Sequence, residues 1–128
     1  MVSPMSPLIT PADAPVYAMP GIEFTGFAAP SRGAAENAVW TVCIEPGTPG
    51  VLHSLTREEV MIALEGRARI TITGEDHDLE AGGAVVIPAD TEFALANPYD
   101  APFRAVAVLP VGGKARVGDE TFVPPWTV

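Results

Sequence analysis

The chain of 128 residues is poor in cysteine and in histidine. Cys43 stands alone, so no disulfide can form within the chain. This fits a reducing cytoplasm, where disulfides are rare, and we expect Cys43 to act as a small hydrophobic side chain. The chain has two histidines, His53 and His77, so a site built from imidazole groups must use one or both of them.

Basic residues are also few, with 7 lysines and arginines against 16 aspartates and glutamates and a net charge of −9. An acidic surface without a basic stripe repels phosphate backbones, which argues against nucleic-acid binding. The same charge disfavours anionic membranes, and no apolar run approaches the ~20 residues of a membrane span. The N-terminus lacks the basic and apolar regions of a signal peptide. We therefore expect a cytoplasmic protein without nucleic-acid or membrane partners.

Turn-forming residues are abundant, with 14 prolines and 12 glycines in a chain that is 48% hydrophobic. A chain of this length is enough for one domain with its own core. Residues 67–73 alternate most cleanly, with Ala68, Ile70 and Ile72 on the face that should point inward. Short apolar runs between turns predict further strands at 38–45, 52–55, 59–64, 84–87, 92–96 and 103–109. We expect an all-β sandwich or jelly roll with ten or so strands.

The two ends of the chain differ from this pattern. Residues 1–20 hold five prolines, which predicts an extended arm with one short strand near residues 8–10. Residues 111–128 form a tail that ends in Pro-Pro-Trp, and Trp126 is expected to pack on the barrel or across a subunit interface. Because the arm, the tail and the sheet edges all gain from being covered, we expect a homodimer.

A first motif runs from Gly47 to Gly66 with the spacing G-x5-H-x5-E-x6-G, in which the histidine is His53 and the glutamate is Glu59. It resembles the first motif of the cupin superfamily, except that the family's second histidine is Leu55 here. The resemblance implies a single cupin domain over 1–128. Its double-stranded β-helix, a jelly-roll barrel, would span 38–110.

A second stretch resembles the second cupin motif, with Gly82, Pro88 and Asn97 at the family's spacing. Asp90 takes the place of a glycine, which the fold tolerates because aspartate can adopt the left-handed turn conformation. Phe93 takes the place of a histidine. The fold is therefore expected to persist while the chemistry changes.

The resemblance implies a metal site in which four side chains converge on one ion, and two of those four are present here. His53 and Glu59 match ligand positions, whereas Leu55 and Phe93 offer no lone pair. Two protein ligands are fewer than the three of an open catalytic site. His77 should lie outside the barrel. We therefore expect no metal cofactor.

What remains is an apolar pocket with two polar groups. Burial should raise the pKa of the Glu59 carboxyl, and a protonated His53 beside it should lower that pKa again. Such a pair can serve as general base and acid. The side chains expected around them are Trp40, Val42, Leu55, Met61, Phe93 and Leu95. This predicts a small-molecule-binding cupin, with metal-independent isomerisation, cyclisation, dehydration or decarboxylation as the candidate reactions.

Three alternatives stay open. His53 and Glu59 could hydrogen-bond each other or backbone groups inside a filled barrel. A metal-dependent oxygenase or isomerase would need a non-standard ligand set. A binding protein without catalysis would need the same pocket as an enzyme. In either case, Arg104 would neutralise a carboxylate on the ligand if its side chain pointed inward.

Overall fold

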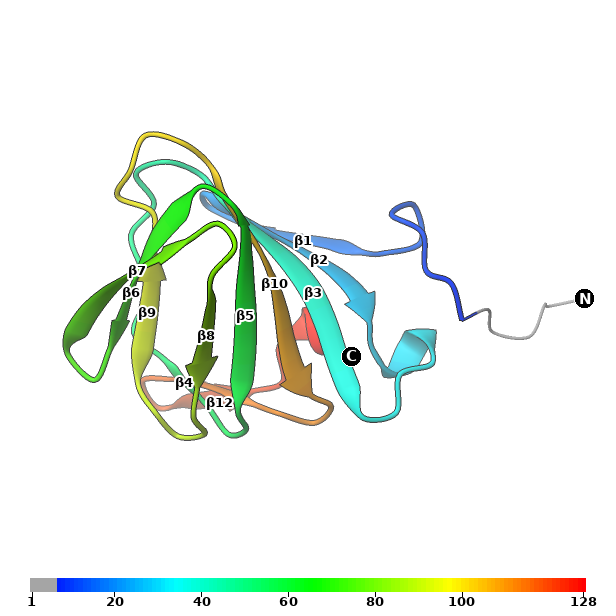
Figure 1. The fold of residues 1–128 in the computed structure, drawn as a ribbon. Coiled ribbons are helices and arrows are strands. Elements are labelled where there is room, and N and C mark those ends of the chain that lie inside the picture. The colour runs from blue at the N-terminus through cyan, green and yellow to red at the C-terminus, as the bar shows by residue number, and fades with distance from the viewer. Residues whose placement is uncertain (1–6) are drawn as a thin grey trace, which may run out of the picture.

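In the computed structural model, which describes residues 7–128, the chain is built almost entirely of β-strands (Figure 1). Two single turns of 3-10 helix, η1 (Pro30–Arg32) and η2 (Pro125–Thr127), are the helical elements of that part of the chain. None of its helices has the length and apolar character that crossing a membrane requires. The strands are β1 (Val16–Met19), β2 (Ile22–Ala28), β3 (Asn37–Ile44), β4 (Ser54–Leu55), β5 (Glu59–Glu65), β6 (Arg67–Ile72), β7 (Glu75–Glu80), β8 (Ala84–Ile87), β9 (Phe93–Ala96), β10 (Phe103–Pro110), β11 (Ala115–Val117) and β12 (Glu120–Phe122).

The strands form three antiparallel sheets. Six of them pair in the order β1-β2-β3-β10-β5-β8, three in the order β7-β6-β9, and three in the order β12-β11-β4. In Figure 1 the β6–β7–β9 sheet lies at one side and β1–β2–β3 at the other, with β5, β8 and β10 between them. The β11–β12 hairpin crosses the lower end of the barrel. This confirms the all-β jelly-roll fold.

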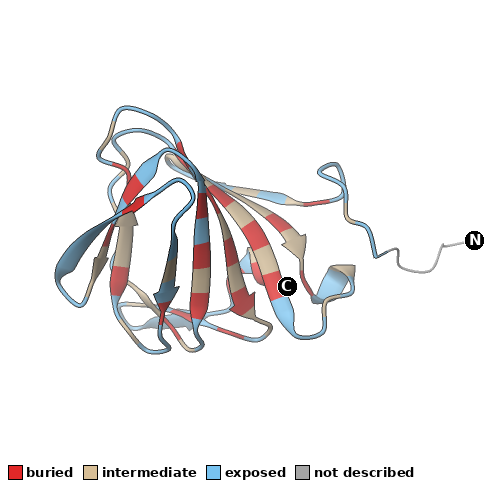
Figure 2. Ribbon diagram, in the orientation of Figure 1, coloured by how far each residue is buried: buried red, intermediate tan, exposed pale blue. Residues whose placement is uncertain are grey.

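Alternation along the strands separates the core from the surface, as the red bands of Figure 2 show. Ala68 and Ile70 of β6 are buried and Ile72 is half-buried, as the pattern of residues 67–73 predicted. In β10 every second side chain is buried, and Ala105 and Ala107 are fully enclosed.

Several motif residues hold the backbone rather than a ligand. The buried side chain of Asn97 donates to the carbonyl oxygens of Ile44 at 2.9 Å and Ala101 at 2.8 Å, and accepts from the amide of Tyr99 at 3.1 Å. Gly66 has a φ of 70°, and a Cβ there would lie 2.2 Å from the carbonyl oxygen of Pro102. These positions are therefore structural requirements of the turns.

Two local expectations were wrong. The strand expected near residues 8–10 is absent, and the first strand among residues 7–128 is β1, because residues 10–14 turn through a hydrogen bond from the amide of Asp13 to the carbonyl of Thr10. The sequence Gly-Glu-Asp at 74–76 predicts a hairpin turn, but Glu75 and Asp76 already pair with β6 as the start of β7. The tail also contributes two strands that the sequence did not predict, β11 and β12, whose register brings Ala115 opposite Leu55.

Candidate functional site

The barrel encloses a cavity of about 800 Å³ that opens to solvent. The side chains at its opening are apolar and exposed, and include Val16, Met19, Val51 and Phe122. Every residue that the sequence placed around a pocket lies on this one wall: Trp40, Val42, His53, Leu55, Glu59, Met61, Phe93 and Leu95. A pocket of this size accommodates an organic molecule with one or more rings.

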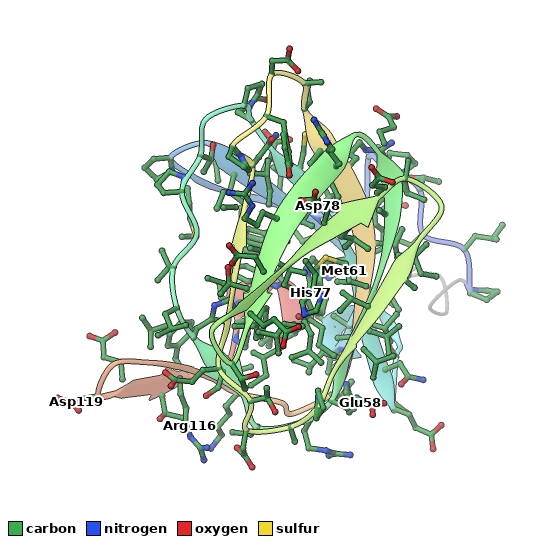
Figure 3. All side chains as sticks on the ribbon, turned by 60° about the vertical axis from the view of Figure 1, so that its left-hand side comes forward. Glu58, Met61, His77, Asp78, Arg116 and Asp119 are labelled. Carbon is green, nitrogen blue, oxygen red and sulfur yellow. The ribbon has the colours of Figure 1, made fainter. Side chains whose placement is uncertain are left out.

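Glu59 is the first residue of β5, opposite Ile87 of β8, and its side chain is 4% exposed. Alternation along β5 turns Glu59 and Met61 to the inside, where Met61 lies among the side chains within the barrel (Figure 3). No residue in the described part of the chain forms a hydrogen bond or an ion pair with the Glu59 carboxyl. Burial raises the pKa of this carboxyl from 4.5 to about 8. At neutral pH the group is therefore a protonated acid that can donate a hydrogen bond.

His53 is held by an isolated bridge to β9. Its amide donates to the carbonyl of Phe93 at 2.9 Å, its carbonyl accepts from the Phe93 amide at 2.8 Å, and the two rings lie 4.2 Å apart between centroids. The ring nitrogen Nδ1 lies 2.8 Å from the carbonyl oxygen of Val51. A carbonyl oxygen only accepts, so Nδ1 carries the hydrogen and Nε2 keeps a lone pair in the neutral ring.

Burial also lowers the pKa of His53 below its usual 6.5, and the hydrogen bond to Val51 offsets this only in part. The imidazole is therefore neutral at pH 7. The expectation that a protonated His53 would lower the pKa of Glu59 was wrong, because burial is the cause of the Glu59 shift and no neighbouring charge contributes. The cavity thus holds an acid and a base that are both uncharged.

The filled-barrel alternative is also contradicted. An open volume of about 800 Å³ separates the walls, and His53 and Glu59 form no hydrogen bond with each other. The polar groups of a filled barrel would need such partners. Here the His53 ring has one backbone partner, and the Glu59 carboxyl has none among residues 7–128.

Sequence reasoning placed Trp40 on the wall but missed the aromatic residues beside it, Tyr17, Phe24 and Trp126. The indole of Trp126 stacks on the ring of Phe24, with centroids 3.7 Å apart and planes 2° from parallel. Tyr17 and Trp40 lie at 6.4 and 6.5 Å from the same indole, and all four residues line the cavity. The tail therefore packs on the barrel, as expected for Trp126, but it also closes one side of the cavity. The weak alternation of residues 22–27 was the one sequence signal for Phe24.

The other polar residues considered from the sequence lie outside. His77 is exposed on β7. Arg104 is exposed and pairs with Glu65 at 3.3 Å, so it does not reach a ligand in the cavity. Asp90, at a φ of 59°, pairs with Arg116 at 2.7 Å on the surface.

The donor set does not fit a metal centre. His53 and Glu59 line the cavity, but Leu55 and Phe93 occupy the neighbouring wall. No group of three or more histidine, cysteine, aspartate or glutamate side chains suited to a metal ion occurs among residues 7–128. An open catalytic metal site normally takes three protein ligands.

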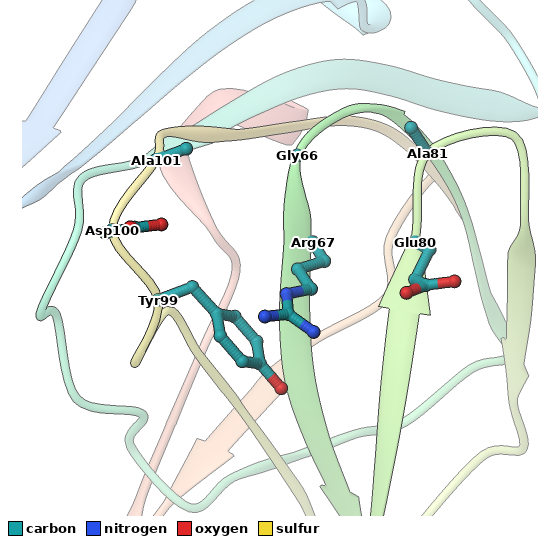
Figure 4. Close-up of a pocket in the computed structure, with 7 residues that line it drawn as sticks. All are labelled: Gly66, Arg67, Glu80, Ala81, Tyr99, Asp100 and Ala101. Atoms are coloured by element: carbon teal, nitrogen blue, oxygen red, sulfur yellow. The ribbon is translucent and has the colours of Figure 1, made fainter.

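A second hollow lies on the surface, and its lining includes Gly66, Arg67, Tyr99 and Ala101 (Figure 4). Its volume is about 370 Å³. The guanidinium of Arg67 lies over the ring of Tyr99, 3.8 Å from the centroid, and the Tyr99 hydroxyl donates to Asp78. Its guanidinium and its phenol hydroxyl are thus already partnered.

Comparison with known proteins places this architecture in a family. Residues 40–109 match the family described as Cupin domain. No curated protein matches the chain in sequence. Among solved structures, the polyketide cyclase RemF from Streptomyces resistomycificus superposes with a TM-score of 0.75 at 16% identity, over 94% of this chain and 83% of that one.

Two further structures show how widely the fold is used. A cupin-superfamily sugar phosphate isomerase from Silicibacter pomeroyi gives a TM-score of 0.65 at 22% identity, over 84% of this chain and 75% of the other. The 7S globulin of Momordica charantia gives 0.70 at 21%, over 81% of this chain and 35% of the globulin. At these identities the likeness shows the fold alone, and any chemistry has to be argued from the residues of the site. With more than half of its length matched to the family and the barrel matched in structure, the chain belongs to the cupin family.

Proposed function

We propose that the protein binds a largely apolar, ring-containing carbonyl compound in the cavity and moves a proton on it without a metal ion. The observation that carries this proposal is the buried Glu59 carboxyl, which faces the cavity and has no partner among the described residues. Its oxygens are not among the fully enclosed side-chain atoms without a partner, which in residues 7–128 are Arg32 Nη2 and Trp126 Nε1, so they open onto the cavity. A ligand in the cavity can therefore accept the hydrogen bond that the protonated acid donates.

The two neutral groups suit proton transfer next to a carbonyl. Glu59 donates its proton to the carbonyl oxygen while Nε2 of His53 takes a proton from the adjacent carbon. The products of this step are the enol, a carboxylate and an imidazolium. No charged group has to be desolvated before the reaction begins, because both start uncharged.

Two outcomes then conserve atoms and charge. If the ligand carries a second double bond, so that the enol is a conjugated dienol, His53 can return its proton at the far end of the dienol while Glu59 recovers its own, and the result is isomerisation of the double bond. If the enol carbon bonds to a second carbonyl carbon, the new alkoxide takes the imidazolium proton, the enol hydroxyl returns its proton to Glu59, and a ring is closed. The cyclase and isomerase among the structures of similar fold make both reaction types reasonable candidates.

The test uses 2-tetralone, a ring-containing ketone, in D2O. The rate at which deuterium replaces its α-protons is measured by NMR with and without the protein. We expect the native protein to accelerate this exchange, and Glu59→Gln and His53→Gln each to remove most of the acceleration. Glu58→Gln and His77→Gln are matched controls, because both residues are exposed. A Glu59→Gln/His53→Gln double variant as fast as the native protein would eliminate the proposal.

Binding without turnover is the second candidate, and the same unpartnered carboxyl supports it. It predicts that 2-tetralone binds in the cavity while its α-protons exchange at the background rate. The homodimer and the cytoplasmic location expected from the sequence stay predictions. Light scattering at micromolar concentration tests the first, with twice the 13.4 kDa of one chain as the expected mass.

A further inference from the structure

The cavity wall carries few ionisable side chains. Four of its side chains can ionise: Tyr17, His53, Glu59 and Glu120. Among residues 7–128, no lysine or arginine lines it. His53 and Glu59 are uncharged at neutral pH because they are buried. Within the cavity, therefore, no cation is available to an anionic ligand.

Three arginines near the barrel point away from the cavity, and Arg32, which donates to the carbonyl of Phe27 at 2.9 Å, does not line it either. Arg116 lies between Ala115 and Val117, which both line the cavity, but alternation along β11 turns its side chain outward to Asp90 (Figure 3). Arg104 pairs with Glu65 on the outside of β10. Arg67 lies over the ring of Tyr99. Bringing any of them to the cavity would require breaking these contacts and reversing the strand alternation.

The entrance of the cavity also disfavours anionic ligands. Glu120 is exposed and lines the cavity from β12, and the whole chain carries a net charge of −9. An anion would approach against this field. Inside, it would lose its hydration without an ion pair to replace it, and the one hydrogen bond that the neutral Glu59 acid can donate would offset only part of that loss.

We infer that the cavity selects its ligands by charge, so that it binds uncharged aromatic compounds and rejects carboxylates, sulfonates and phosphates of the same size. This rests on the proposed binding site and narrows its substrate class to neutral molecules. It does not depend on the proposed proton transfer, because binding and exchange are measured separately. The selection follows from which side chains line the wall.

A matched pair of fluorescent probes tests the inference. N-phenyl-1-naphthylamine and 8-anilino-1-naphthalenesulfonate share one aromatic skeleton and differ by a sulfonate. In titrations of the native protein at pH 7, we expect the neutral probe to bind at least ten-fold more tightly, and 2-tetralone to displace it. Equal affinities at a shared, competitive site would overturn the inference, as would failure of the neutral probe to bind. This comparison needs no variant.

Adding a cation to the wall should reverse the preference. In Met61→Lys, the new ammonium would replace a buried side chain of the cavity, so we expect the sulfonate's affinity to rise by at least ten-fold relative to the neutral probe. The matched control is Ile62→Lys, on the outward face of the same strand, where Ile62 is 47% exposed. A similar gain in both variants would mean that the sulfonate binds on the surface, and would contradict the inference.

If 2-tetralone exchange fails while the probe preference holds, the proton-transfer proposal falls and the charge selection stands. If exchange is catalysed while the two probes bind equally, the charge selection falls and the proton transfer stands.

Discussion

Glu59 and Asp78 are both carboxylates on strands of the same barrel, but their surroundings differ. Asp78 is exposed on β7 and accepts a hydrogen bond from Tyr99, whose ring also carries the guanidinium of Arg67. Glu59 is buried on β5, faces a cavity and has no partner among residues 7–128. At the surface, water and neighbouring charges satisfy the polar groups. In the cavity, protonation neutralises the Glu59 carboxyl, and the carboxyl can then donate its hydrogen bond to a ligand.

The comparison shows how a cupin that lacks part of the family's metal-ligand set can retain a reactive carboxyl. Leu55 and Phe93 lie on the same cavity wall as Glu59 and leave its side chain in apolar surroundings. Apolar walls alone raise its pKa. The same walls neutralise His53, whose Nδ1 hydrogen bond to Val51 directs the free lone pair to Nε2.

The largest effect is expected on proton transfer. Glu59→Gln keeps the shape of the side chain but removes the acidic proton, so 2-tetralone exchange should slow by about 10²–10⁴-fold, as for loss of a general acid. Asp78→Asn should change the rate by less than two-fold, because Asp78 lies outside the cavity. NMR exchange rates on both variants check this. If both variants slowed exchange equally, the account that Glu59 acts in the cavity and Asp78 does not would be contradicted.

Stability should depend on pH through Glu59. Its pKa is about 8 in the folded chain and 4.5 without burial, so the folded state holds a proton that the unfolded state has already released between those values. The stabilisation from this proton is complete below pH 4.5 and is lost as pH rises through about 8.

Glutamine has no proton to lose, so Glu59→Gln should be more stable than the native protein by roughly 3 kcal/mol at pH 7 and about equal to it at pH 4. Urea unfolding at both pH values measures the difference. Asp78→Asn, as the surface control, should shift the unfolding free energy by less than ~1 kcal/mol. A Glu59→Gln variant less stable than the native protein at pH 7 would show that the carboxylate has a partner.

Trp126→Ala tests whether the cavity wall depends on the tail. The stack with Phe24 and the contacts with Tyr17 and Trp40 would be lost, which should cost about 2 kcal/mol because the indole is only partly buried. Affinity for N-phenyl-1-naphthylamine should fall at the same time. Unchanged probe affinity in a destabilised protein would mean that the indole is structural and not part of the ligand site.

The smallest effect is expected at the surface hollow. Arg67→Ala removes the guanidinium that lies 3.8 Å from the centre of the Tyr99 ring. Because the contact is exposed to water, unfolding free energy should fall by about 0.5–1 kcal/mol, and probe binding in the cavity should stay unchanged. A loss of probe affinity here would show that the two regions are coupled.

Sequence predicted most of the fold because its determinants are local. Gly66 and Asn97 stand at turns whose backbone geometry demands them, and the alternation of β6 fixes its inward face. The short strands β1, β11 and β12 were missed because three or four residues carry little periodic signal, and β11 also pairs with β4, which is distant in the chain.

The site was predicted in its residues but not in its electrostatics. The motif spacing singled out His53 and Glu59, yet their charge states depend on the extent of burial and on which backbone carbonyl faces Nδ1. Trp126 reaches the wall from more than a hundred residues beyond Phe24, through packing that no local pattern encodes. Long-range placement of this kind requires the folded structure.

The central claim is that Glu59 is a neutral acid at physiological pH, and its carboxyl pKa tests this most directly. In protein labelled with ¹³C at the glutamate carboxyl carbons, NMR spectra recorded from pH 4 to pH 10 report each titration, and the signal missing from Glu59→Gln identifies the residue. The account predicts that this signal titrates near pH 8. A Glu59 carboxyl that is already ionised at pH 6 would contradict it.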